Sequence, residues 1–104
     1  MKISILLPYK ENFSPIYPGA VSLFVRDTVR LSKYRKNITI YGNTDLKKKF
    51  NLKYFNIPLS KIRFQSKSKV YVSEFLKLEK KNPSNLIEIH NRPNYLEELV
   101  SNLD

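Results

Sequence analysis

Three consecutive polar residues near the end of the chain carry side chains that could bind a sugar or a phosphate. His90, Asn91 and Arg92 directly follow the alternating apolar run at 86–89. They offer a titratable imidazole, an amide that both donates and accepts hydrogen bonds, and a permanent cation. This combination suits sugar hydroxyls together with a phosphate. A lone histidine is often structural as well, so the role of His90 depends on where the fold places it.

A second candidate site lies at Gly19 and Ala20, where a proline-rich loop enters a predicted helix. The loop spans residues 8–18 and contains three prolines. Glycine allows a ligand or another backbone to approach closely, and a helix N-terminus presents free N–H groups to an anion. Gly19 and Ala20 are therefore predicted to contact substrate. The alternative is that the glycine serves the close packing of the helix on the first strand.

Other chemistries find little support in the residue types. The chain has no cysteine and one histidine, which argues against thiol chemistry and a multi-histidine metal site. It carries no G-x-G-x-x-G fingerprint, phosphate-binding loop or nucleophile elbow. Glu11 and Glu88 could act as a carboxylate pair only if the fold brought them within about 5–10 Å, which the sequence does not determine. We therefore name no catalytic residue and expect neither metal nor cofactor.

Strand and helix patterns alternate along the chain. Runs of β-branched and apolar residues predict strands at 2–7, 37–41, 61–65 and 86–90. Amphipathic spacing and capping residues predict helices over 19–34, 44–49, 69–81 and 94–102. This order indicates one α/β domain over residues 1–104, with a Rossmann-like, mostly parallel sheet in the spatial order 3-2-1-4 and helices on both faces.

The predicted strand order determines where the candidate residues meet. The order reverses between the first and fourth strands, and ligands of open α/β sheets bind outside the carboxyl ends of the strands at such a point. We therefore expect Leu7 and His90 to lie at neighbouring strand ends. The loops that follow them would then face one groove.

The charge of the chain is strongly positive. It has 19 basic residues against 9 acidic ones, a net charge of +10, with many of the cations between Lys47 and Lys81. Such a field attracts nucleic acid, an anionic membrane surface or a phosphorylated substrate, although lysines also serve simply as a solvated surface. Fourteen of the cations are lysine and 5 are arginine. Because base readout favours arginine, this ratio argues against sequence-specific recognition of nucleic acid.

The hydropathy pattern predicts a soluble, cytoplasmic protein. The longest apolar run covers residues 3–7 and is interrupted by a serine, whereas a spanning helix needs about 20 apolar residues. No signal-peptide pattern follows Lys2. Peripheral association with the inner face of the plasma membrane through the lysines remains compatible with this expectation.

Three segments resemble the N-terminal domain of glycosyltransferase family 4. They are M-K-I-S-I-L-L-P at 1–8, P-G-A-V-S-L-F-V-R-D-T-V-R-L-S-K at 18–33 and N-L-I-E-I-H-N-R-P at 85–93. The resemblance implies the GT-B architecture, in which two Rossmann-like domains enclose the active site. It also implies that Gly19 and Ala20 approach donor phosphate and acceptor. His90, Asn91 and Arg92 would line the cleft on the acceptor side.

The implied activity is hexosyl transfer from a nucleotide-sugar donor to a glycan or lipid-linked acceptor, in the synthesis of surface polysaccharide or lipopolysaccharide. In the family that the chain resembles, a C-terminal domain makes most of the nucleotide-sugar contacts. We therefore expect the 104 residues to be an incomplete N-terminal domain that is inactive alone. A second chain or a missing C-terminal domain would complete the cleft.

Two other functions remain open at this point. The first is a non-enzymatic basic module that binds nucleic acid or an anionic membrane surface. The second is a regulatory or scaffolding protein without a substrate, in which the seven tyrosines and six phenylalanines serve an interface. An incomplete sheet would leave an edge through which copies of the chain could pair as a homo-oligomer.

Overall fold

Parallel strands form the centre of the computed structural model, which describes residues 1–59 and 66–90. The four strands in this part of the chain are β1 (Ile3–Leu6), β2 (Ile38–Gly42), β3 (Tyr54–Asn56) and β4 (Leu86–Ile89). They pair in the order β3-β2-β1-β4, and every pairing is parallel. The predicted α/β class and the predicted order 3-2-1-4 are both confirmed.

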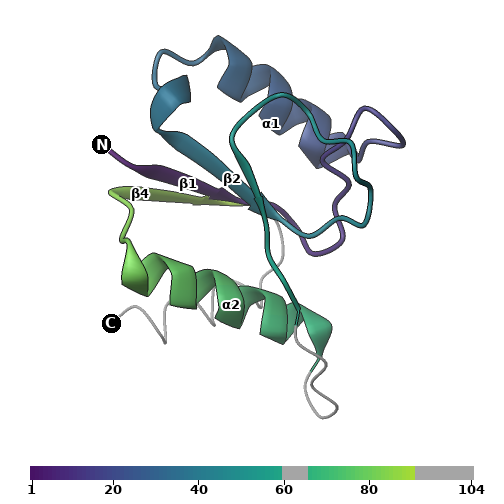
Figure 1. The fold of residues 1–104 in the computed structure, drawn as a ribbon. Coiled ribbons are helices and arrows are strands. Elements are labelled where there is room, and N and C mark those ends of the chain that lie inside the picture. Colours follow the sequence, from purple (N-terminus) through teal and green to yellow (C-terminus); the bar gives the residue numbers. More distant parts are fainter. Residues whose placement is uncertain (60–65, 91–104) are drawn as a thin grey trace.

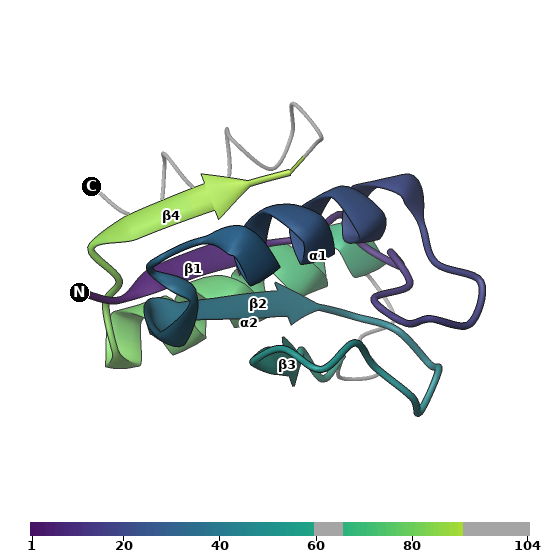
Figure 2. The ribbon, with the colours of Figure 1, turned by 90° about the horizontal axis from the view of Figure 1, so that it is seen from above.

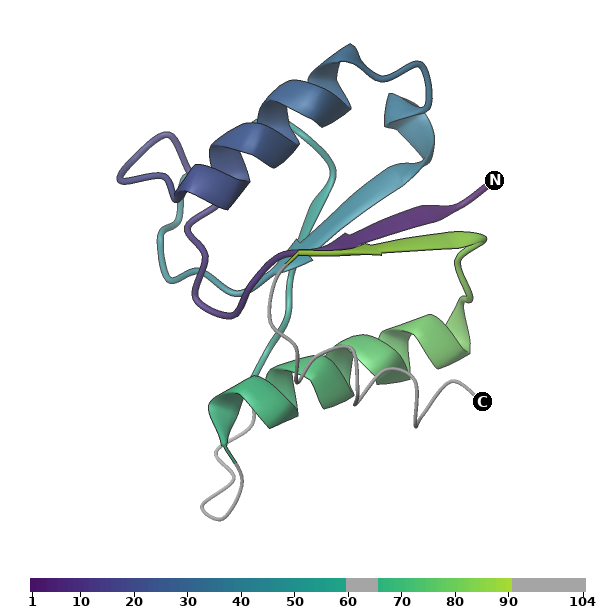
Figure 3. The same cartoon turned by 180° about the vertical axis from the view of Figure 1, so that it is seen from behind.

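In the part of the chain that the structure describes, one long helix covers each face of the sheet. Helix α1 (Ala20–Leu31) lies over one face and α2 (Lys67–Lys81) over the other (Figures 1 and 3). Seen from above, α1 lies across β1 and β2, with α2 below the sheet (Figure 2). A short 3₁₀ helix, Arg35–Asn37, leads into β2. This two-faced arrangement is typical of Rossmann-like folds.

The core consists of two apolar clusters, one on each face of the sheet. Strand β1 serves both because successive side chains of a strand point to opposite faces. Ile3 and Ile5 pack with Val25 and Val29 of α1, whereas Leu6 packs with residues of α2. All four residues of β1 are buried. This double burial explains why the chain begins with an almost continuous apolar run.

A buried carboxylate links β1, α2 and the start of β4. Glu79 of α2 is only 3 % exposed, and its Oε1 accepts hydrogen bonds from Ser4 Oγ at 2.5 Å and Ser84 Oγ at 2.8 Å. Its Oε2 accepts one from the backbone N–H of Ser84 at 2.9 Å. Buried polar groups are tolerated when they are hydrogen-bonded in this way. The network explains why a glutamate occupies the apolar face of α2.

The predicted helix over 44–49 is wrong. Residues 43–49 form a loop, in which the Thr44 hydroxyl donates to Asn12 Oδ1 at 2.9 Å and accepts from the Leu46 N–H at 3.3 Å. Threonine at a helix start and threonine in a local turn use the same hydroxyl. In this chain the Thr44 hydroxyl holds a local turn and also contacts Asn12 in the loop after β1, and no helix follows.

The third strand lies elsewhere than predicted. It is the edge strand β3 at Tyr54–Asn56, in a stretch where the sequence pattern predicts neither a strand nor a helix. Pro58 follows the end of β3 and therefore does not interrupt its pairing. The predicted strand at 61–65 and the predicted helix at 94–102 lie outside the described residues.

Helix α1 is shorter than predicted, and its apolar stripe is displaced. It ends at Leu31, because Ser32 has extended backbone angles. Val25 and Val29 are buried as core residues, but Phe24 is 59 % exposed and Leu31 is 84 % exposed. The amphipathic spacing therefore predicts the helix correctly, but two of its large apolar residues are exposed.

Candidate functional site

The carboxyl ends of β1, β2 and β4 lie side by side. Leu6 of β1 is in register with both Tyr41 of β2 and Ile89 of β4. Just beyond the strands, the His90 N–H donates to the Leu6 carbonyl at 3.0 Å and the Leu7 N–H donates to the Tyr41 carbonyl at 2.9 Å. Leu7 and His90 therefore lie at neighbouring strand ends, as the sequence predicts.

His90 is held by a carboxylate on the α1 side of β4. Its Nε2 lies 2.6 Å from Glu88 Oε2, and its ring meets the Phe24 ring of α1 edge-on at 6.1 Å between centroids. The histidine side chain is 19 % exposed. Glu88 and His90 lie together because alternate residues of a strand share a face. Asn91 and Arg92, the other two members of the predicted trio, lie outside the described residues.

The Gly19–Ala20 turn receives an acidic side chain of the chain itself. Gly19 is the N-cap of α1, and Glu11 Oε2 accepts a hydrogen bond from the Ser22 N–H in the first turn at 3.0 Å. A Cβ added to Gly19 would lie 1.7 Å from Glu11 Oε2. The glycine therefore makes room for the Glu11 carboxylate, which occupies the position where an anion would interact with the helix N-terminus.

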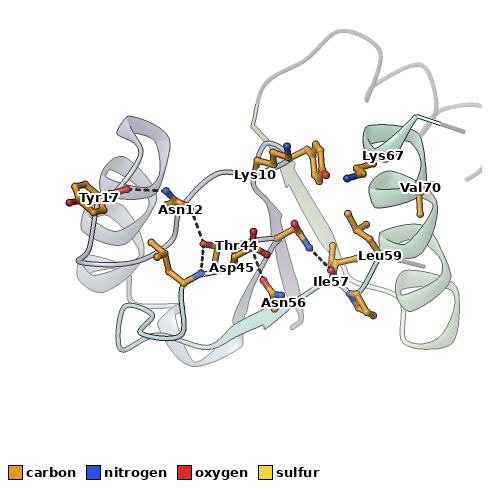
Figure 4. Close-up of a pocket in the computed structure, with 14 residues that line it drawn as sticks. Lys10, Asn12, Tyr17, Thr44, Asp45, Asn56, Ile57, Leu59, Lys67 and Val70 are labelled. Atoms are coloured by element: carbon orange, nitrogen blue, oxygen red, sulfur yellow. Dashed lines mark hydrogen bonds between the residues drawn. The ribbon is translucent and has the colours of Figure 1, made fainter. Parts of the chain in front are cut away.

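A pocket of about 770 Å³ opens at the same edge of the sheet, on the side of β2 and β3 (Figure 4). Its walls are the loops after β1, β2 and β3 and the first turn of α2. The polar residues that line it are Lys10, Asn12, Asn43, Thr44, Asp45, Asn56 and Lys67. Gly19, Ala20 and His90 do not line this pocket. The structure thus places the predicted residues and the cavity at two parts of one edge.

Hydrogen bonds between loops fix one polar wall of the pocket. Thr44 donates from its hydroxyl to Asn12 Oδ1 at 2.9 Å and from its backbone N–H to Asn56 Oδ1 at 2.9 Å. Asn12 Nδ2 donates to the Tyr17 carbonyl at 3.2 Å. These contacts join the loops after β1 and β2 to the last residue of β3. A ligand would meet a wall whose side chains are already oriented.

Tyr54 contacts the same wall of the pocket through Asn56. Its hydroxyl donates to Asn56 Oδ1 at 2.9 Å, and its ring stacks on Phe13 with centroids 5.2 Å apart. Burial raises the pKa of the Tyr54 hydroxyl well above its usual range. The group therefore remains a protonated donor. Gly42 permits this position, because a Cβ there would lie 2.8 Å from the Tyr54 hydroxyl oxygen.

Two amide groups remain available to a ligand. Asn43 Nδ2 donates to the Ile57 carbonyl at 2.9 Å, which fixes the amide while its Oδ1 accepts no bond from the residues described. Asn56 uses Oδ1 for two donors, and its amide nitrogen makes no hydrogen bond within the described ranges. One acceptor and one donor thus border the cavity. This pair suits hydroxyl groups, which both donate and accept.

Sequence reasoning missed the residues of the pocket. Asn43, Thr44 and Asp45 follow the second predicted strand, where the capping pattern predicts a helix over 44–49 in place of a binding loop. The signal that could have found them is the rule that ligands bind outside the carboxyl ends of parallel strands. Applied to every strand and not only to the first and fourth, it would have drawn attention to this loop.

No protein-family model, curated protein or solved structure matches the chain. Within residues 1–59 and 66–90, no group of three or more His, Asp or Glu side chains could hold a metal ion. None of the helices described is long and apolar enough to cross a bilayer. The function must therefore be inferred from the fold and the pocket.

Proposed function

We propose that the chain is the acceptor-side domain of a glycosyltransferase. In this proposal it takes part in moving a sugar from a nucleotide-sugar donor to a glycan or lipid-linked acceptor during surface polysaccharide or lipopolysaccharide synthesis. The Rossmann-like fold agrees with the GT-B resemblance of residues 1–8, 18–33 and 85–93. The pocket at the carboxyl edge of the sheet is the main support.

The chemistry of the pocket suits a sugar acceptor. Its volume of about 770 Å³ falls in the usual range for small-molecule sites. Amides at Asn43 and Asn56 offer an acceptor and a donor to hydroxyl groups, and the Thr44 network holds the loops that carry them. Apolar and aromatic neighbours such as Tyr9 and Ile57 complete the lining. Fixing an acceptor in one orientation is a large part of what glycosyl transfer requires.

The resemblance adds two further groups of substrate contacts to the proposal. Gly19 and Ala20 would approach donor phosphate and acceptor, and His90, Asn91 and Arg92 would line the cleft on the acceptor side. Gly19 is the N-cap of α1 and His90 follows β4, and neither residue lines the pocket. Transfer also needs fixed positive charge on the departing diphosphate. The resemblance assigns most of that charge to a C-terminal domain, so we expect the 104-residue chain to bind an acceptor without transferring sugar. We place it in the cytoplasm, at the inner face of the plasma membrane.

Titration of the ¹⁵N-labelled chain with a disaccharide tests the acceptor site. We expect shifts of the Asn43 and Asn56 side-chain amides and weaker binding by Thr44→Val, which keeps the shape but removes the hydroxyl. The matched control is Thr28→Val on the exposed side of α1, which should bind as the parent does. If the disaccharide shifts no pocket resonance, the acceptor proposal is wrong. Sugar transfer by the purified chain would contradict its expected inactivity.

A further inference from the structure

We infer that the pocket takes an acceptor that carries a phosphate group, held by Lys10 and Lys67. The sugar part of this inference rests on the proposed function, whereas the phosphate part rests on the two lysines alone. Both residues line the pocket and both are exposed. Neither forms an ion pair with another residue of the described ranges.

Lys10 stands at a backbone position that does not favour lysine. The turn after β1 is closed by a hydrogen bond from the Glu11 N–H to the Pro8 carbonyl at 3.1 Å, with Lys10 as its third residue. The φ of Lys10 is 67°, in the left-handed region that glycine or asparagine adopts more easily. Its ammonium group lies 5.6 Å from the centre of the Tyr9 ring, at the rim of the pocket.

Lys67 also stands where a cation is unfavourable. It is the first residue of α2, at the positive end of the helix dipole, and the first turn contains no acidic residue. Ser66 caps the helix by accepting from the Lys69 N–H at 3.3 Å, and Lys67 lines the pocket. In Figure 4 the Lys67 ammonium points from α2 towards the rim that carries Lys10.

Lys10 has a backbone conformation that lysine rarely adopts, and Lys67 is a cation at the positive end of a helix. Because both line one cavity, they indicate an anionic ligand. A phosphate has several oxygens around one centre and can accept from ammonium groups that come from different directions. Asp45 lies among the residues of the loop after β2, where its carboxylate would repel an anion. We therefore expect the phosphate to bind at the part of the pocket that Lys10 and Lys67 line, and the sugar to bind near Asn43 and Asn56.

The test compares glucose 1-phosphate, glucose and inorganic phosphate as probes of the labelled 104-residue chain. Lys10→Asn removes the charge while keeping a residue that tolerates left-handed backbone, and Lys67→Gln removes the other charge. Lys80→Gln, an exposed lysine of the same helix outside the pocket, is the matched control. We expect each pocket variant to lower the affinity for glucose 1-phosphate about tenfold, with glucose binding unchanged. The control should bind as the parent does, and thermal melts will test whether all three variants are folded.

The outcomes separate the inference from the proposed function. Equal binding of glucose and glucose 1-phosphate, unchanged by either pocket variant, overturns the phosphate inference and leaves the sugar site standing. Inorganic phosphate that binds as tightly as glucose 1-phosphate, and is lost in both variants, supports the lysine site but contradicts the sugar acceptor. Vesicles of phosphatidylcholine with phosphatidylglycerol identify a lipid source if Lys10→Asn alone reduces their binding. An equal reduction by Lys80→Gln shows surface attraction and counts against the pocket.

Discussion

The N-termini of the two long helices occupy equivalent places in the fold but differ in charge. Both helices begin at the carboxyl edge of the sheet. The first turn of α1 receives the Glu11 carboxylate from the preceding loop, whereas α2 begins with Lys67 and has no acid in its first turn. One end is neutralised by the chain itself, and the other borders the open pocket. The fold offers both positions, and the side chains determine which of them is free for a ligand.

Gly19→Ala should disrupt the contact between Glu11 and the N-terminus of α1, with the largest expected effect on stability. The new Cβ would lie 1.7 Å from Glu11 Oε2, so the carboxylate must leave the first turn of α1. We expect a loss of about 2 kcal/mol in the free energy of unfolding, as for a helix that loses its N-terminal partner, measured by urea denaturation. In the double variant Gly19→Ala, Glu11→Ala the two losses should not add, because the alanine no longer meets the carboxylate. Additive losses would show that the glycine serves another contact.

Alkaline pH should loosen the wall on the pocket side. The pKa of Tyr54 is raised in the folded chain by burial, so above the ordinary tyrosine value of about 10 the unfolded chain loses this proton first. Stability from this group is complete below that pH and falls as pH rises, by at most about 1.4 kcal/mol per pH unit. Urea denaturation at increasing pH, compared with Tyr54→Phe, measures the difference. If the free energy of unfolding fell equally with pH in the parent and in Tyr54→Phe, Tyr54 would not be the cause of the loss of stability.

Glu11→Gln tests whether charge, and not only hydrogen bonding, matters at α1. The amide oxygen can still accept from the Ser22 N–H, but the negative charge at the positive helix end is lost. We expect a loss of about 1 kcal/mol in the free energy of unfolding at low salt, and a smaller loss at high salt because exposed charges are screened. Asp27→Asn, on the same helix but away from its first turn, is the control. A loss that salt does not change would indicate geometry alone.

Much of the fold could be predicted because its signals are local. The buried run of β1, the spacing of α1 and the alternation at β4 each depend on neighbouring residues, and together they gave the strand order. β3 and the 43–49 loop could not be predicted in this way. β3 has three residues, and Thr44 bonds to Asn12, a loop residue far away in the sequence. Such contacts exist only after the strands have paired.

The candidate site also has parts that local patterns predict and parts that depend on long-range contacts. The adjacency of Leu7 and His90 followed from strand order alone, and the structure confirms it. The carboxylate of Glu11 at Gly19 did not follow, because a side chain that reaches back onto a helix leaves no periodic pattern. The pocket was missed for a related reason, since its asparagines lie in the loops after β1 and β2 and at the last residue of β3. Local patterns thus predict the scaffold, and tertiary contacts decide which part of it is open.

The smallest effect is expected from making the two helix ends alike. Lys67→Glu gives α2 an acid in its first turn, which should stabilise the chain by about 0.5 kcal/mol at low salt. The same change places a negative charge where we propose a phosphate, so binding of glucose 1-phosphate should be lost while stability rises. Lys80→Glu, near the other end of α2, should be slightly destabilising because the dipole has the opposite sign there. Thermal melts and the NMR titration measure the two quantities on the same samples. If Lys67→Glu raised stability and left phosphate binding intact, the open end of α2 would be a surface feature and not part of a binding site.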